Sequence, residues 1–212
     1  MRNGRLLSLS MTETSKNNYQ IIGYLYDTFE FVVFNTNRYK DKNKYLLDIG
    51  AISNIHYLRE ENRNEIKLVG DIVLDKYLTK SELYKFLNDQ RNDFSRFKRQ
   101  RTETFGVIKI NNIEEITIES NKKLESNLIL ISNGVKEKVR IKDYRWLSYW
   151  NYIYQLNDGM KINERREYYR KFFNSKETYV ILFRLKSKLN NTSNNRFIKN
   201  NDIYWISGIF YI

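Results

Sequence analysis

The order of predicted strands and helices in the second half of the chain restricts its fold more than any other feature. Runs of β-branched and aromatic residues predict strands there, at 105–110, 113–118, 128–131, 135–141, 179–185 and 203–212. The first two form one long strand that is broken near residues 111 and 112. Ser132-Asn133-Gly134 predicts a hairpin, because Asn-Gly accepts the positive φ angles of a type I′ turn.

Two helices are predicted between residues 141 and 179. Asp143 is expected to cap the first, which places apolar residues on one face: Trp146, Trp150, Ile153 and Tyr154. The second follows Gly159 and runs to Phe173. The order of elements in residues 102–212 is therefore β-β-β-α-α-β-β.

The first third of the sequence predicts a small β unit. Its strands are expected at 5–11, 19–26, 29–34, 44–52 and 65–74, with no helical period over a useful length. Residues 79–99 differ, because Thr79-x-x-Glu82 is a capping box and an apolar stripe follows at helical spacing. We therefore expect an N-terminal unit at 1–77, a basic amphipathic connecting helix at 78–101 and a C-terminal unit at 102–212.

Five strands with helices between the third and fourth are the chain order of an OB-fold, a partly open Greek-key barrel. We expect a mainly β protein of two small OB-like barrels joined by a helix. The sequence also resembles the prokaryotic dual OB-fold-containing proteins, which implies that architecture and a nucleic-acid-linked context. The resemblance rests on short motifs: Leu6-Leu-Ser-Leu-Ser10, Leu46-Leu-Asp48-Ile, Glu61-Asn62, Phe105-Gly-Val-Ile-Lys-Ile110, Ile141-Lys-Asp143 and Tyr204-Trp-Ile-Ser-Gly-Ile209.

Composition excludes several kinds of function. With no cysteine and His56 as the single histidine, the 212 residues offer no thiol nucleophile, cysteine-ligated metal or multi-histidine cage. No apolar run approaches the roughly 18 residues that a membrane span needs, and the first ten residues are too polar for a signal peptide. We expect a cytoplasmic protein with no cofactor, no metal and no membrane partner.

The net charge of +12 points to an anionic partner because it is unevenly distributed. Residues 1–77 carry 11 basic and 10 acidic residues, residues 78–101 carry 7 and 3, and residues 102–212 carry 19 and 12. OB-type barrels bind single strands with a cationic groove and aromatic rings. The sequence therefore predicts a non-catalytic nucleic-acid-binding protein, for single-stranded or structured DNA or RNA, that acts within a larger prokaryotic or phage-related machine.

Two groups of residues are the predicted binding site. The first is the loop between the last two strands, with Tyr204 beside it: Lys186, Lys188, Arg196 and Lys199. The second is the end of the connecting helix: Arg96, Lys98, Arg99 and Arg101. A further cluster has two possible roles, phosphate binding or the formation of local ion pairs. It consists of Arg165, Arg166, Arg170 and Lys171, with Tyr168 and Tyr169.

Two alternatives remain open at this point. A Mg²⁺-dependent nuclease places an Asp upstream of Glu-x-Lys on neighbouring strands, and Asp48 with Glu65 and Lys67 matches that loose spacing. Alternatively, the protein is an interaction subunit of a multiprotein complex without direct nucleic-acid binding, and its apolar C-terminal strand, 203–212, either completes its own barrel or pairs with a partner chain.

Overall fold

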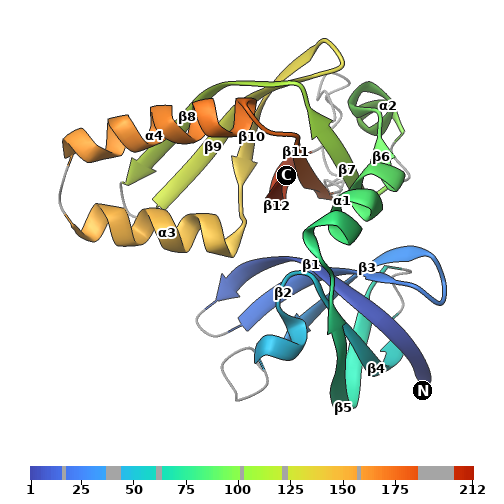
Figure 1. Cartoon of the computed structure of the whole chain (residues 1–212). Helices are drawn as coiled ribbons and strands as arrows, with labels where there is room; N and C mark the ends of the chain where they lie inside the picture. Colours follow the sequence, from blue (N-terminus) through green and yellow to red (C-terminus); the bar gives the residue numbers. More distant parts are fainter. Residues whose placement is uncertain are drawn as a thin grey trace, which may run out of the picture.

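The computed structural model describes residues 1–15, 18–36, 44–60, 64–100, 103–120, 124–156, 159–185 and 203–212. The first sheet is antiparallel and has the order β3-β2-β1-β4-β5 (Figure 1). Its strands are β1 (Arg2–Ser15), β2 (Asn18–Leu25), β3 (Glu30–Thr36), β4 (Ala51–Arg59) and β5 (Ile66–Tyr77). β3 and β5 are the two edge strands of this sheet. One isolated parallel bridge joins Val33 of β3 to Glu65, directly before β5, so the two edges approach each other there.

The predicted strand at 44–52 is wrong. Residues Lys44–Leu47 form a 3-10 helix, η2, and the strand that follows is β4. The two are separated by a turn at Gly50, whose φ of 88° is one that glycine adopts without strain. The Gly50 N–H donates to Ser8 O (2.8 Å), which ties this turn to β1.

The second sheet has the order β6-β7-β11-β12-β10-β9-β8. Its strands are β6 (Arg91–Asn92), β7 (Phe105–Ile110), β8 (Asn112–Ser120), β9 (Leu124–Ser132), β10 (Val135–Ile141), β11 (Thr178–Leu185) and β12 (Ile203–Tyr211). Two contacts in it are parallel, β10 with β12 and β6 with β7. The predicted type I′ hairpin is confirmed by positive φ angles at Asn133 (49°) and Gly134 (76°).

Helices α3 (Tyr144–Gln155) and α4 (Gly159–Asn174) lie side by side against the second sheet (Figure 1). The predicted cap is confirmed, because the Asp143 side chain accepts from the N–H groups of Arg145 and Trp146. Trp146 of α3 packs against Tyr169 and Phe173 of α4. Within the described ranges, no helix is long and apolar enough to cross a membrane.

A single helix over 79–99 is wrong: the segment forms α1 (Lys80–Asp89), then β6, then α2 (Phe94–Arg99). The capping box at Thr79 and Glu82 is present as expected. The break follows from Asp93, which is extended (φ −71°, ψ 128°) because it caps a new helix with its side chain. Asn92 contributes too, since its side chain accepts from the Val107 N–H of β7 (3.0 Å).

The mainly β composition is as expected; the strands form two sheets, and where two small barrels were expected the paired strands of the described residues form no closed barrel. One apolar core is formed by side chains of the first sheet, and another lies between the second sheet and its helices. A third core is shared: it contains Leu7 and Leu9 of β1, Leu87 of α1, and Phe105 and Ile181 of the second sheet. Gly208 of β12 marks the close approach of the two sheets, because a Cβ there would lie 3.1 Å from Ser10 Cβ.

Candidate nucleic-acid interface

The predicted site residues divide into two sets. Five of them lie outside the described residues: Arg101, Lys186, Lys188, Arg196 and Lys199. The other four lie at α2, where the structure brings them together: Arg96, Lys98, Arg99 and Tyr204.

Asp93 positions α2 on the second sheet. Its Oδ1 accepts from the Arg96 N–H (2.7 Å), and its Oδ2 accepts from Asn133 Nδ2 in the β9–β10 turn (2.8 Å). These hydrogen bonds, first that from the Arg96 N–H and then that from Asn133, lower the pKa of Asp93. The contact fixes the start of α2 beside the hairpin.

Arg96 and Arg99 are exposed, while Phe94 and Phe97 on the other side of α2 are fully buried. Both guanidinium groups use neutral acceptors. Arg96 Nε donates to Gln100 Oε1 (3.1 Å), and Arg99 Nε donates to Ser95 O (3.3 Å). Their charges are therefore not matched by a carboxylate in these contacts.

Lys98 and Tyr204 serve mainly to hold α2 in place. Lys98 forms an ion pair with Glu137 of β10 and lies 5.8 Å from the centroid of the Phe94 ring. Tyr204 packs its ring 5.9 Å from that of Phe97, and its hydroxyl donates to Lys98 O (3.5 Å). Both residues were predicted to bind nucleic acid, and their contacts account for them within the fold.

Arg184 is a supporting residue that sequence reasoning missed. It is 1% exposed, and its guanidinium lies against the rings of both Phe97 (4.7 Å) and Tyr204 (5.2 Å). It donates to the carbonyl oxygens of Phe97 and Gln100 at the C-terminal end of α2, where helix carbonyls attract a cation. The available signal was a lone arginine within the apolar run 179–185.

β10 carries a row of cations that the sequence prediction also left out. Lys136, Lys138 and Arg140 alternate along the exposed face of the strand. Lys136 pairs with Glu114 and Arg140 with Glu125, whereas no ion pair among the described residues involves Lys138. The strict alternation in 135–141 was the signal that would have identified this face.

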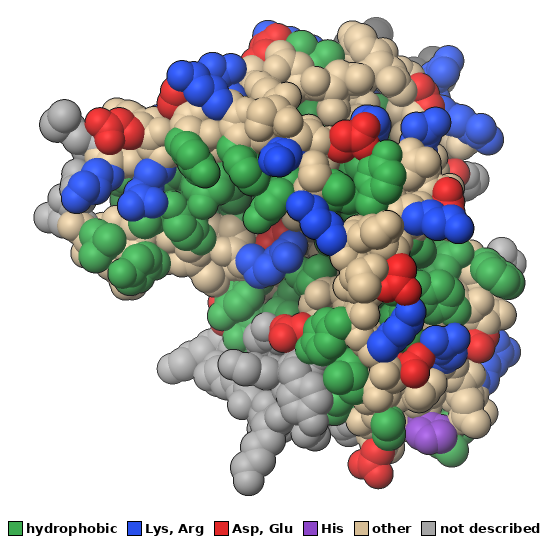
Figure 2. Space-filling model, viewed as in Figure 1, with side chains coloured by type: hydrophobic (Ala, Val, Ile, Leu, Met, Phe, Trp, Pro, Cys, Tyr) green, Lys and Arg blue, Asp and Glu red, His purple; other side chains and the backbone are tan. Residues whose placement is uncertain are grey.

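We use the name basic edge for three exposed cations around α2: Arg91, Arg96 and Arg99. Arg91 lies in β6 directly before α2, and its Nη1 donates to the amide oxygen of Asn88 (3.1 Å). None of the three belongs to an ion pair within the described ranges, and Figure 2 shows Lys and Arg side chains gathered over α2 at the upper right.

The α4 cluster is largely occupied by internal contacts. Arg170 and Lys171 both pair with Glu167, and Arg166 donates to Ile116 O (2.7 Å). Arg165 donates to the Tyr149 hydroxyl (2.8 Å). These contacts match the local ion pairs that the sequence left open as an alternative.

The residues of the nuclease alternative occupy two places. Glu65 and Lys67 line a small cleft together with Glu60, next to β3, and Asp48 is not part of its described lining. Among the described residues, no group of three or more His, Asp or Glu side chains is placed to hold a metal ion.

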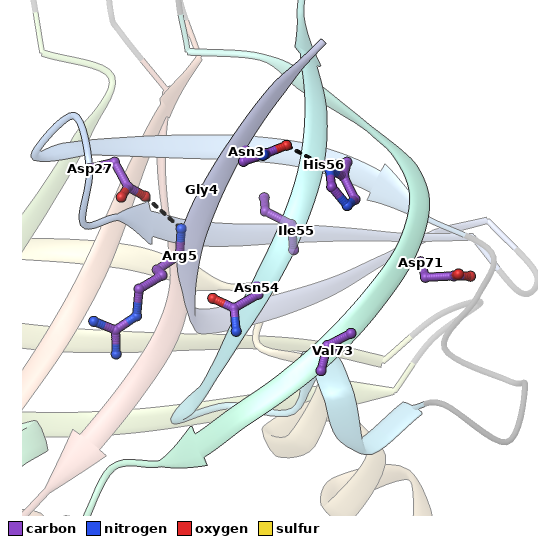
Figure 3. Close-up of a pocket in the computed structure, with 9 residues that line it drawn as sticks. All are labelled: Asn3, Gly4, Arg5, Asp27, Asn54, Ile55, His56, Asp71 and Val73. Atoms are coloured by element: carbon purple, nitrogen blue, oxygen red, sulfur yellow. Dashed lines mark hydrogen bonds between the residues drawn. The ribbon is translucent and has the colours of Figure 1, made fainter.

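A separate polar hollow of about 350 Å³ lies on the first sheet (Figure 3). His56 is held there by a 2.6 Å contact between its Nδ1 and Asn3 Oδ1, and Asp27 accepts from the Arg5 N–H. The Arg5 guanidinium extends away from His56 and pairs with Asp75. The hollow thus contains charges that are engaged with their neighbours.

Asp93→Ala is expected to lower the free energy of unfolding, since an N-cap is lost. Asp93→Asn should cost less because Asn is an equally good N-cap. The native carboxylate should contribute above its ordinary pKa of 3.8, and that contribution should fade as the pH falls toward its lowered native pKa. Urea unfolding as a function of pH measures this, and an Ala variant as stable as the wild type at neutral pH would contradict it.

No family model matches this sequence, and no curated protein matches it. Among solved structures, p202 HIN1 in complex with a 12-mer double-stranded DNA is 11% identical, with a TM-score of 0.43 over 99% of this chain and 91% of that chain. The Ifi202 HINa domain in complex with a 20-bp double-stranded DNA is 12% identical, with a TM-score of 0.41 over 100% and 95%. At such TM-scores these likenesses carry no argument about this chain.

Proposed function

We propose that this protein binds nucleic acid without catalysing a reaction and that the basic edge contacts the phosphates. The observation that carries the proposal is the set of three exposed cations around α2 that form no ion pair in the described structure, although the charge of Arg99 acts on Asp93. Arginine presents a planar fork of donors that fits phosphate oxygens, and all three cations are arginines. Their present acceptors are neutral, so a phosphate competes with weaker hydrogen bonds.

The support beneath α2 makes the basic edge a rigid surface. Asp93 fixes the start of the helix, Arg184 binds its last carbonyl groups, and Lys98 links its middle to β10. Because the backbone beneath the arginines is fixed, the entropy lost on binding is limited to the side chains.

We further propose that each sheet is an OB-like unit. In the second sheet, β8, β9 and β10 are neighbours in chain order, the two helices follow, and β12 lies parallel to β10. β8 is one edge strand of this sheet, β7 is next to the two-residue edge strand β6 at the other side, and β7 and β8 are separated in the chain by Asn111 alone. The face of strands 2 and 3 is a ligand-binding surface of OB-folds, and here it corresponds to β9 and β10 with the exposed cation row.

The triple variant Arg91→Gln/Arg96→Gln/Arg99→Gln tests the proposal. Its affinity for a fluorescent oligonucleotide at low salt should fall by about 10- to 100-fold, as three exposed charge contacts are lost. Fluorescence anisotropy measures this for single-stranded and double-stranded probes. The same samples with Mg²⁺ should leave the probe uncut.

The matched control removes three exposed cations from the first sheet. Arg2→Gln/Lys67→Gln/Lys76→Gln changes the net charge equally but leaves the basic edge intact. It should bind almost as well as the wild type. Equal losses in both triple variants would show a general effect of net charge and would refute a site at α2.

A further inference from the structure

A second surface combines exposed aromatic rings with positive charge, on α4 and the end of β12. Tyr168 is 60% exposed and Tyr211 is 48% exposed. Figure 2 shows hydrophobic side chains interleaved with Lys and Arg over the helical part of this face. We use the name aromatic ridge for Tyr168, Phe172 and Tyr211.

The rings of the aromatic ridge are held by one another. Tyr168 is nearly parallel to Phe172, with an interplanar angle of 16° and centroids 6.0 Å apart. Tyr211 meets Phe172 edge-on, with centroids 4.9 Å apart, and also contacts the buried ring of Phe173. The exposed rings are therefore fixed before any ligand arrives, which reduces the entropy cost of stacking on them.

The surroundings of the ridge are basic. Residues 159–176 contain six basic residues and two acidic ones. Lys171 is 72% exposed and lies three residues after Tyr168 on α4. Glu167 offsets part of this charge through Arg170 and Lys171, yet an exposed pair in water is weak enough for a phosphate to compete.

We infer that the aromatic ridge stacks the bases of a single-stranded nucleic acid. The inference rests on the proposed function and adds the class of polymer to it. Base faces are available for stacking in a single strand, and each stacked base is a sequence-tolerant contact. Aromatic residues and arginine are enriched in protein–protein interfaces but lysine is depleted there, so the exposed Lys171 favours a nucleic acid over a protein partner.

The double variant Tyr168→Ala/Tyr211→Ala tests this inference. Its affinity for a single-stranded oligonucleotide should fall by about 10-fold for each ring that is lost. The salt dependence should stay unchanged because the rings contact no phosphate, and duplex affinity should also stay unchanged. Tyr168→Phe/Tyr211→Phe keeps both rings and should bind like the wild type, as should Phe29→Ala, which removes a ring that is 78% exposed on the first sheet.

Single-strand affinity that survives the Ala double variant would overturn the inference, as would an equal loss on duplex and single strand. In either case the Arg91/Arg96/Arg99 variant shows separately whether the proposed function holds. A wild-type protein that binds no oligonucleotide would refute both. A protein that co-purifies with the wild type and is lost from the Ala variant, with oligonucleotide affinity intact, would replace the nucleic acid by a protein partner at this surface.

Discussion

Replacing Arg184 by Met is expected to lower the free energy of unfolding by about 3–5 kcal/mol. The side chain is 1% exposed and donates to two carbonyl groups at the end of α2, those of Phe97 and Gln100. Met fills much of the space but donates no hydrogen bond, so two acceptors lose a charged donor. The contacts with the Phe97 and Tyr204 rings are lost as well.

Urea unfolding measures this change directly. Arg184→Lys should fall between the wild type and Met, because an ammonium keeps the charge without the planar fork. Arg140→Met is the control, since that arginine is exposed and its pair with Glu125 contributes little. If the Arg184→Met variant unfolded at the urea concentration of the wild type, the proposed support beneath α2 would be wrong.

Phe105→Ala is expected to destabilise the whole molecule by about 3–5 kcal/mol. Phe105 is 6% exposed in the core shared by the two sheets. Its ring lies 5.3 Å from that of Phe183 in β11 and 6.3 Å from that of Phe31 in the first sheet. Because both sheets contribute to this core, we expect them to unfold in one transition.

Two probes separate joint unfolding from independent unfolding. All three tryptophans belong to the second sheet and its helices, so their fluorescence reports on that part. Amide hydrogen exchange in β1 and β2 reports on the first sheet. In Phe105→Ala, both probes should report a loss of stability: unfolding seen by tryptophan fluorescence should become easier, and amide exchange in β1 and β2 should become faster. A loss of stability seen only by the tryptophans would show that the sheets unfold separately.

The sequence correctly predicted the turn and the helix caps that involve only residues close together in the chain. The Asn133-Gly134 turn, the Asp143 cap and the Thr79 capping box each involve residues close in sequence, and all are present. The broken helix was missed because a polar residue such as Asp93 also fits the exposed face of a continuous helix. Its role as a cap depends partly on Asn133, 40 residues away.

The candidate site could not be defined from the sequence alone, because it also depends on contacts between residues far apart in the chain. The sequence identified Arg96, Lys98 and Arg99 as cations at a helix end, and composition alone treats the three alike. Glu137, which neutralises Lys98, is 39 residues away, and Arg184 reaches α2 from β11. These long-range contacts separate the cations that remain exposed from those that hold the fold.

The dependence of affinity on salt concentration tests the central claim most directly, since phosphate binding releases counterions. For a single-stranded probe, the slope of log K against log salt should be about −0.7 per phosphate neutralised. The Arg91→Gln/Arg96→Gln/Arg99→Gln variant should therefore flatten the wild-type slope by about two units, whereas the first-sheet control variant should leave it unchanged. A steep slope that is identical in the wild type and both variants would contradict phosphate binding at the basic edge.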